Sequence, residues 1–316
     1  MAKSYITQEV FEDILMSLLH DAGYETEVIE IEGRIGPERK LLQKERQKHS
    51  LTAAVRIDEL YEDYMRDLTE GHPVMMDTVV NKVIEAFHTT PPIGYTLDEV
   101  KKILGDWQEV KQRLFLDICN RYKNHDYIKG KVFEYIEDLA LVAKICINRS
   151  NGQTCSCPVN EDMVAEWGVT KEEVMTEAKK NAENIVPAIF GNSQEVAGMM
   201  MSNILENNAE ADILPMLALM MAPPNFHVIT TVNNDTAAAL FYDGMMDKVA
   251  EEFNGFFFVI PSSNKELLIL PGDDFTTPAE LSSMIQDVNN SDRVTEDEIL
   301  SDHAYVYKNG KFSSFV

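Results

Sequence analysis

The chain has 316 residues, of which 45% are hydrophobic and 26% charged. This length favours two domains, and this composition excludes a chain that is disordered throughout. The 53 acidic residues outnumber 28 basic ones, which gives a formal net charge of -25. Such a charge disfavours sequence-independent nucleic-acid binding by the whole surface and is compatible with docking of a basic protein partner.

Four cysteines, Cys119, Cys146, Cys155 and Cys157, are too few for a disulfide framework in a chain of this size. The first ten residues lack the basic and apolar regions of a signal peptide. The longest apolar stretch, 213–224, is interrupted by Pro215 and is too short to span a bilayer. We therefore expect a cytoplasmic protein that does not enter the membrane.

The first part of the chain alternates helical and strand patterns. The segment 34–49 is rich in Lys and Arg, and we interpret it as a solvated loop between two strands, with contact to an anionic ligand as the alternative. The elements expected here are a helix over 6–22, strands over 25–32 and 51–57, and helices from 58 to 70, over 75–87 and over 97–122.

The middle of the chain is less regular. Residues 135–147 predict a buried strand, 154–159 a second strand, and Thr170 with Glu173 a capping box that opens a helix. Residues 191–222 are rich in methionine and acidic side chains, so we interpret them as a linker or a mobile cover.

The last hundred residues predict strands and helices in the order β-α-β-β-α-β, a split two-layer unit. The two runs 256–260 and 267–270 are apolar at every position, which places this hairpin in the middle of a sheet covered on both faces. The other expected elements are a strand over 227–232, a helix over 236–253, a capped helix from 277, a further capping signature at 295–298 and a final strand over 304–307.

These elements predict an α+β fold with helix-covered mixed or antiparallel sheets. We expect an N-terminal helical or α+β domain over 1–130 and a C-terminal α+β domain over 131–316.

Four segments together carry a resemblance to a known family. They are DELYEDY (58–64), VKQRLFLDICNRYKN (110–124), WGVTKEEV (167–174) and IPSSNKEL (260–267). The chain resembles an uncharacterised bacterial family, a domain of unknown function common in anaerobic Gram-positive bacteria and related to YtpQ-like proteins. The resemblance implies a cytosolic setting and supplies no substrate, cofactor or catalytic residue. Residues 191–222 depart from the family's pattern.

Strong catalytic motifs are absent from the sequence. It has no phosphate-binding loop, no Gly-x-Ser-x-Gly elbow and no His-Glu-x-x-His helix. Cys155 and Cys157 are separated by one residue, which fits two thiols on one face of a strand better than a zinc knuckle. Asn124-His125-Asp126 fits a helix end better than an acid–base loop. We therefore expect no metal, no cofactor and no assigned catalytic residue.

The hairpin tip is the best candidate binding site. Ser262, Ser263, Asn264 and Lys265 cluster there, and a serine nucleophile would need a base such as His227 or His303. Polar residues at a tip are also what a turn requires.

We expect a non-enzymatic cytosolic protein that binds or regulates another macromolecule. One alternative is a small-molecule-binding protein or hydrolase that uses the tip at 261–265. The other is an acidic inhibitor or nucleic-acid mimic that binds a basic partner. The oligomeric state stays open.

Overall fold

The computed structural model describes residues 6–33, 36–44, 54–71, 75–88, 95, 97–150, 153–207, 220, 226–290 and 294–316. The chain divides into two compact units, Met1–Val100 and Lys101–Val316, called unit 1 and unit 2 below. In the described parts of the chain, no helix combines the length and the apolar character needed to cross a membrane.

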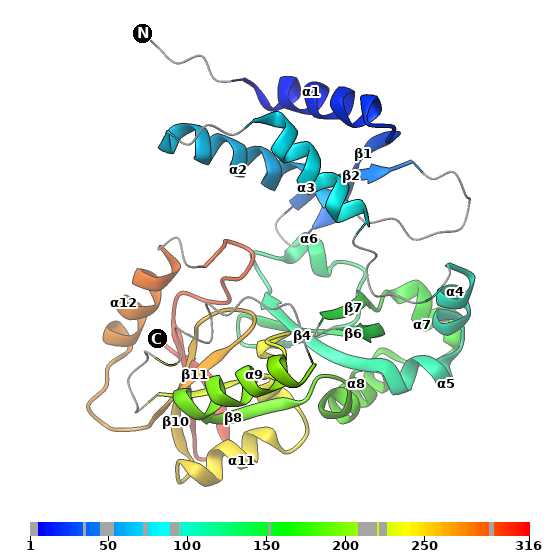
Figure 1. Ribbon diagram of the computed structural model, residues 1–316. Coiled ribbons are helices and arrows are strands. Elements are labelled where there is room, and N and C mark those ends of the chain that lie inside the picture. The colour runs from blue at the N-terminus through cyan, green and yellow to red at the C-terminus, as the bar shows by residue number, and fades with distance from the viewer. Residues whose placement is uncertain are drawn as a thin grey trace. The chain divides into compact units, whose positions relative to one another are not determined.

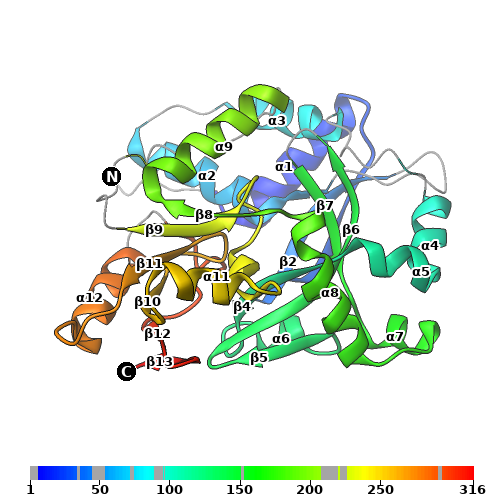
Figure 2. The ribbon, with the colours of Figure 1, turned by 90° about the horizontal axis from the view of Figure 1, so that it is seen from below.

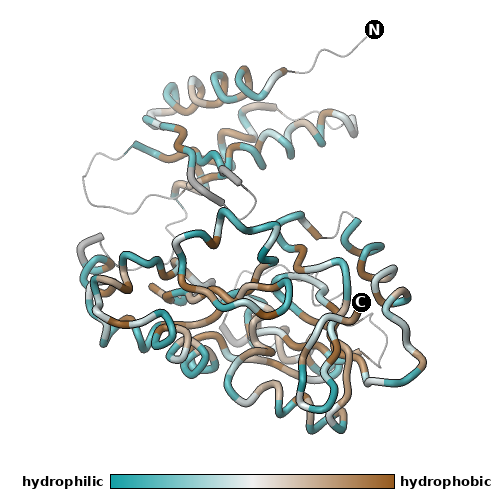
Figure 3. The backbone as a smooth tube through the Cα atoms, turned by 180° about the vertical axis from the view of Figure 1, so that it is seen from behind, coloured by the Kyte–Doolittle hydropathy of each residue, from teal (hydrophilic) through white to brown (hydrophobic). Residues whose placement is uncertain are grey.

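Unit 1 packs three helices against a three-stranded antiparallel sheet of order β1-β2-β3. Its elements are α1 (Gln8–Asp21), β1 (Thr26–Gly33), β2 (Gly36–Gln43), β3 (Ala54–Arg56), α2 (Ile57–Glu70) and α3 (Met76–His88) (Figure 1). Hydrophilic and hydrophobic turns alternate along these helices, as expected for helices with one buried face (Figure 3). The buried core includes Phe11, Leu15 and Leu19 from α1 and Val83 from α3.

The interpretation of 34–49 as a loop is wrong for the residues that the structure describes. Strand β2 lies there, in the centre of the sheet, with Arg39 opposite Glu30 on β1. The strand is stable because Leu41 is fully buried and the Arg39 guanidinium forms a two-pronged ion pair with Glu12 of α1. Residues 34–35 and 45–49 lie outside the described residues.

Unit 2 contains a four-stranded antiparallel sheet in which β6 pairs with β4, β5 and β7. Its strands are β4 (Leu114–Asn120), β5 (Phe133–Ile136), β6 (Leu139–Ser150) and β7 (Gln153–Pro158). The helices of this region are α4 (Leu97–Gly105), α5 (Trp107–Val110), the short 3-10 helix η1 (Lys111–Arg113), α6 (His125–Ile128), α7 (Glu161–Trp167) and α8 (Lys171–Ile185). The expected strands near 135–147 and 154–159 and the Thr170 capping box are confirmed.

The single helix expected over 97–122 is wrong. The helical part ends at η1, and β4 follows with all seven residues buried. A strand forms because β4 pairs with β6 along its whole length and α8 packs against it. Strand β4 precedes the domain boundary expected at residue 130, yet its pairing makes it part of unit 2.

The second sheet of unit 2 has six antiparallel strands in the order β13-β12-β10-β11-β9-β8. Its strands are β8 (Ala188–Asn192), β9 (His227–Thr231), β10 (Phe256–Pro261), β11 (Leu267–Pro271), β12 (Ala304–Lys308) and β13 (Lys311–Phe315). The prediction that the hairpin β10–β11 occupies the middle of a sheet is confirmed. The α+β class and the β-α-β-β-α-β order are confirmed as well, and β13 follows the strand expected to be last.

Helices cover both faces of this sheet. Helices α9 (Ser193–Asn207) and α12 (Pro278–Asn289) pack on the face that carries Val228, Phe258 and Leu268. In Figure 2, α9 lies beside β8 and β9. Helix α11 (Met245–Glu252) and the 3-10 helix η2 (Ala237–Phe241) belong to the other face, because Phe253 contacts the rings of His227 and Phe257.

Two further expectations are wrong. The linker alternative for 191–222 is wrong for 191–207, which are the end of β8 and helix α9; α9 covers the sheet, with Val196 and Met200 buried. Met220 is helical, and 208–219 and 221–222 lie outside the described residues. The helix expected over 236–253 is divided into η2 and α11, because Gly244 between them takes a left-handed conformation with φ of 78°. The capping signature at 295–298 is confirmed as a contact, because Thr295 N donates to Glu298 Oε2 (3.2 Å), and it stands in a turn.

Candidate functional site

The side chains of the hairpin tip are occupied by contacts within the protein. Ser262 Oγ donates to Glu266 Oε1 (3.1 Å), and Lys265 N donates to Ser263 Oγ (3.1 Å). Lys265 Nζ pairs with the Glu298 carboxylate. Asn264 is buried, and its Nδ2 donates to Asp297 O (3.2 Å). Of the four residues predicted as a binding site, Asn264 and Lys265 therefore tie the tip to the 295–298 turn, while Ser262 and Ser263 form contacts within the tip.

Two carboxyl groups at the tip differ in their electrostatics. Burial raises the pKa of Glu266 against the lowering effect of the Ser262 hydrogen bond, and its Oε2 is buried without a hydrogen-bond partner in the described structure. Burial would also raise the pKa of Glu298, but hydrogen bonds from Lys265 and Thr295 outweigh it and hold the pKa below its usual value. The tip is thus a structural turn, and ionisation of the Glu266 carboxyl within it costs free energy because the group is buried.

His227, the fifth predicted residue, lies elsewhere on the sheet. It is opposite Ile269 on β11 and Asn192 on β8, further along the strands than the tip. The structure brings His227 into a pocket that none of the four tip residues lines. A serine of the tip with His227 as its base is therefore not the arrangement found.

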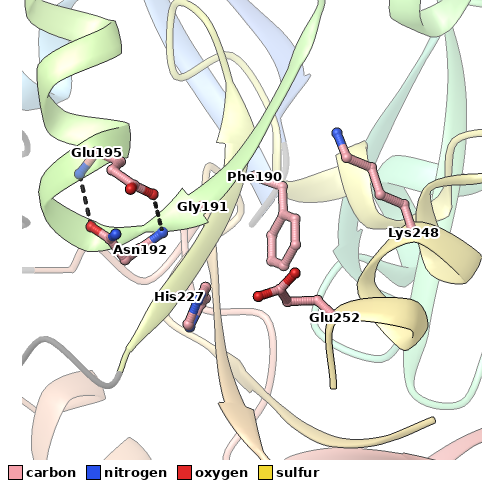
Figure 4. Close-up of a pocket in the computed structure, with 7 residues that line it drawn as sticks. All are labelled: Phe190, Gly191, Asn192, Glu195, His227, Lys248 and Glu252. Carbon is pink, nitrogen blue, oxygen red and sulfur yellow. Dashed lines mark hydrogen bonds between the residues drawn. The ribbon is translucent and has the colours of Figure 1, made fainter. Parts of the chain in front are cut away.

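This pocket lies where β8, β9 and α11 meet (Figure 4) and has a volume of about 260 Å³. The residues that line it are Phe190, Gly191, Asn192, Glu195, His227, Lys248 and Glu252. Pockets for drug-sized ligands begin at about 300 Å³, so this one suits a smaller molecule.

One side of the pocket is fixed by the start of α9. Asn192 Oδ1 accepts from Glu195 N (2.9 Å), and Glu195 Oε2 accepts from Asn192 N (3.3 Å). This reciprocal pair has the form of a capping box. The Glu195 carboxylate is therefore committed to holding the helix start, next to the backbone of Gly191.

One wall of the pocket is formed by the aromatic rings of Phe190 and His227. The rings of Phe190 and His227 are 5.9 Å apart, and Phe253 packs edge-on against His227 at 5.0 Å between centroids. Nδ1 of His227 is buried and has no hydrogen-bond partner in the described part of the chain. The contacts among these rings fix the imidazole as a wall of the pocket.

Two opposite charges come from α11. Lys248 and Glu252 are exposed, lie four residues apart on the helix and form no ion pair with each other or with another described side chain. In Figure 4 the Glu252 carboxylate is directed toward His227 and Phe190, whereas the Lys248 ammonium points away from it. An ammonium four residues before a carboxylate is the less favourable order for a helical ion pair. Both charges are thus available to a ligand.

Sequence reasoning found His227 but missed the rest of this pocket. Phe190 and Asn192 lie at the start of the segment interpreted as a linker, and Lys248 and Glu252 look like ordinary surface residues of a helix. Their four-residue spacing places them on one face of α11, but only the packing of the folded chain brings that face to the pocket beside β8 and β9.

A second polar centre contains the residue types of a serine hydrolase. Ser301 Oγ is 3.0 Å from His303 Nδ1, and the Asp138 carboxylate is 3.6 Å from His303 Nε2. Ser301 is only 2% exposed, however, and its hydroxyl donates directly to Asp138 (2.8 Å). Tyr305 also donates to Asp138 (2.6 Å). A nucleophilic serine must be accessible to substrate, and its hydroxyl must donate to the histidine that acts as its base. Ser301 meets neither condition, so this cluster is a structural link between the two sheets of unit 2.

The cysteines of β7 have no activated thiolate. Burial raises the pKa of Cys155, and it raises the pKa of Cys157 to about 11, against the lowering effect of Lys144. Protonated thiols are poor nucleophiles and poor metal ligands. Among the described residues, no three His, Cys, Asp or Glu side chains converge in a way that could hold a metal ion.

The fold and the pocket define an α+β protein whose larger unit contains a small pocket lined by aromatic side chains and by charges of both signs. Residues 6–309 match the family of unknown function DUF5688, and the chain belongs to that family. No curated protein and no solved structure matches the chain.

Proposed function

We propose that this protein binds a small zwitterion of the amino-acid class in the pocket between β8, β9 and α11. The observation that carries the proposal is the pair of exposed, unpaired charges Lys248 and Glu252 at the rim of one small pocket. A ligand carboxylate would meet Lys248, a ligand ammonium would meet Glu252, and its apolar part would contact Phe190 and His227.

The size and polarity of the pocket support this class of ligand. A volume of about 260 Å³ accommodates a few heavy atoms beyond the two charged groups. A ligand with one charge would leave either Lys248 or Glu252 without a partner, whereas a zwitterion neutralises both. This proposal corresponds to the alternative of a small-molecule-binding protein and not to the expected macromolecular partner, and it moves the site from the hairpin tip to His227 and its neighbours.

The test compares one zwitterion with two blocked analogues by thermal shift and titration calorimetry. Alanine and the larger amino acids are expected to raise the melting temperature, because a ligand that binds only the folded state stabilises it. N-acetylalanine lacks the ammonium and alaninamide lacks the carboxylate, so both should fail. A shift of equal size with both blocked analogues, or no shift with any amino acid, would overturn the proposal.

A matched pair of variants locates the site. Glu252→Gln should abolish the shift, whereas Glu251→Gln, which changes an exposed neighbour that does not line the pocket, should preserve it. The wider expectations of a macromolecular partner, a cytosolic setting and a relation to YtpQ-like proteins stay predictions.

A further inference from the structure

The segment 121–131 of unit 2 is basic, although the chain as a whole is acidic. It carries Arg121, Lys123, Lys129 and Lys131 against one acidic residue, Asp126, while the whole chain has 53 acidic and 28 basic residues. Lys123 and Lys129 are exposed and form no ion pair with a described carboxylate. Positive charge is thus in excess along this segment, as it is along 34–49, although Glu134, Glu137 and Asp138 follow it in the chain.

Two exposed aromatic rings lie within this surface. Tyr122 is 66% exposed and Tyr135, on β5, is 48% exposed. The Arg121 guanidinium carbon lies 4.5 Å from the Tyr122 ring centroid and 5.0 Å from that of Tyr135. Arg121, Tyr122, Lys123, Lys129 and Tyr135 are called the basic aromatic patch below.

The loop that presents the patch is held in one conformation. Asn120, which is 5% exposed, accepts at Oδ1 from the backbone N–H groups of Tyr122 (2.9 Å) and Lys123 (3.0 Å). Its Nδ2 donates to Leu300 O (2.7 Å), which anchors it. The backbone N–H of Arg121 donates to Asp138 O (2.9 Å). The patch is therefore organised before any partner arrives, which lowers the entropy cost of binding.

We propose that the basic aromatic patch binds single-stranded nucleic acid. Bases would stack on the exposed faces of Tyr122 and Tyr135, and phosphates would contact Arg121, Lys123 and Lys129. Positive charge alone suits any polyanion, including an acidic protein. Exposed tyrosine rings beside a guanidinium instead favour single-stranded nucleic acid, because each base has a flat face that can stack on an aromatic ring.

The net charge of the chain limits this binding to the patch. At physiological ionic strength, charges are screened beyond about 8 Å, so the strand senses the local cations more than distant carboxylates. The acidic remainder of the surface would repel the strand elsewhere and restrict its orientation. With three cations in contact with phosphates, log K should fall with log salt with a slope of about -2.

The test measures the fluorescence anisotropy of a labelled 15-nucleotide single strand, as oligo-dT and as oligo-rU, with the full chain at low salt. Saturable binding is expected, and Tyr122→Ala and Tyr135→Ala should each weaken it about tenfold through lost stacking. Lys123→Ala should reduce the magnitude of the salt slope by about one. Phe275→Ala and Lys101→Ala are the matched controls, because both residues are exposed and lie outside the patch.

Two results would overturn the proposal. One is the absence of saturable binding to either strand. The other is displacement of the strand by equal concentrations of poly-glutamate, with the tyrosine variants binding like the wild-type chain, which would indicate an acidic protein as partner. Melting curves of the variants, unchanged within a few degrees, show that any loss reflects the patch and not unfolding. Neither result depends on the pocket of α11, so this proposal and the amino-acid proposal fail separately.

Discussion

At the scale of single residues, Glu266 is the charge least suited to its surroundings. Its carboxyl is buried beside the hairpin tip, and among the described residues Ser262 is the one side chain that donates a hydrogen bond to it. Burial raises its pKa, so ionisation at neutral pH costs free energy in the folded state. We expect Glu266→Gln to increase the free energy of unfolding at pH 7 by about 1 kcal/mol, the scale for a poorly satisfied buried group.

The dependence on pH gives this prediction its control. Because the folded pKa lies above the unfolded value of about 4.3, the wild-type chain loses stability as pH rises from that value through the folded pKa. The advantage of Glu266→Gln should therefore be larger at pH 7 than near pH 3, where the Glu266 carboxyl is neutral in both the folded and the unfolded state. Chemical denaturation at the two pH values measures this difference. An equal advantage at both would contradict the electrostatic explanation, and the exposed variant Glu251→Gln should show little effect at either.

At the scale of elements, the packing of β10 depends on a glycine after β11. Gly272 N donates to Phe256 O (2.9 Å), and a Cβ at Gly272 would lie 2.3 Å from the Phe256 ring. That ring is also held by the Lys308 ammonium at 3.9 Å from its centroid. We expect Gly272→Ala to lower the free energy of unfolding by about 1–3 kcal/mol, because the ring must move from a packed position. Denaturant titration measures the change.

A second glycine serves as the control for this prediction. Gly198 lies inside α9, and a Cβ there would meet nothing within 4 Å. Gly198→Ala should raise stability by about 0.5–1 kcal/mol, since alanine has the higher helix propensity. Opposite signs for the two substitutions would show that space at Phe256 decides the first. If Gly272→Ala left the free energy of unfolding unchanged, the Phe256 ring would have room to move away from the added methyl group, and the prediction would be wrong.

The same scale shows how far the sequence predicts the fold. The apolar runs of β10 and β11 were assigned correctly, because a run of this length bounded by a polar tip suits a strand covered on both faces. Strand β4 was missed because Val110, Leu114 and Ile118 recur every four residues and so extend the helical pattern of α4 and α5. A fully buried strand has no period of its own. Its pairing with β6 decides the outcome, and that pairing is a tertiary contact.

For the candidate sites, too, the sequence indicates single residues but not the tertiary contacts that bring them together. His227 was identified from the sequence, but its neighbours come from β8 and α11, and their approach cannot be read from spacing along one chain. The polar tip of the hairpin had a clear signal in the sequence, yet Glu266 and Glu298 occupy it. Arg121 and Tyr135 are far enough apart in sequence that their contact depends on the pairing of β5 with β6. The sequence therefore predicts which residues are candidates for a site, but not which of them lie together in the folded chain.

At the scale of the whole molecule, the net charge of -25 is the dominant electrostatic property. Like charges repel more strongly in a folded chain than in an expanded one, so the excess of carboxylates destabilises the folded state. Salt shortens the range of this repulsion from about 30 Å at 0.01 M to about 8 Å at 0.15 M. We therefore expect the unfolding transitions at pH 7.5 to move to higher temperature by several degrees between 10 and 300 mM NaCl, as measured by calorimetry.

The pH at which the effect disappears distinguishes repulsion from general salt effects. Near pH 4.6, the isoelectric point calculated from the sequence, the net charge is close to zero and screening should change the melting temperature little. Individual ion pairs such as Arg39–Glu12 would be weakened by salt at both pH values, so they work against the expected gain at pH 7.5. A gain of equal size at pH 4.6 would indicate a general salt effect and not screened repulsion, and a loss at pH 7.5 would show that the ion pairs outweigh the net charge in the stability of this acidic chain.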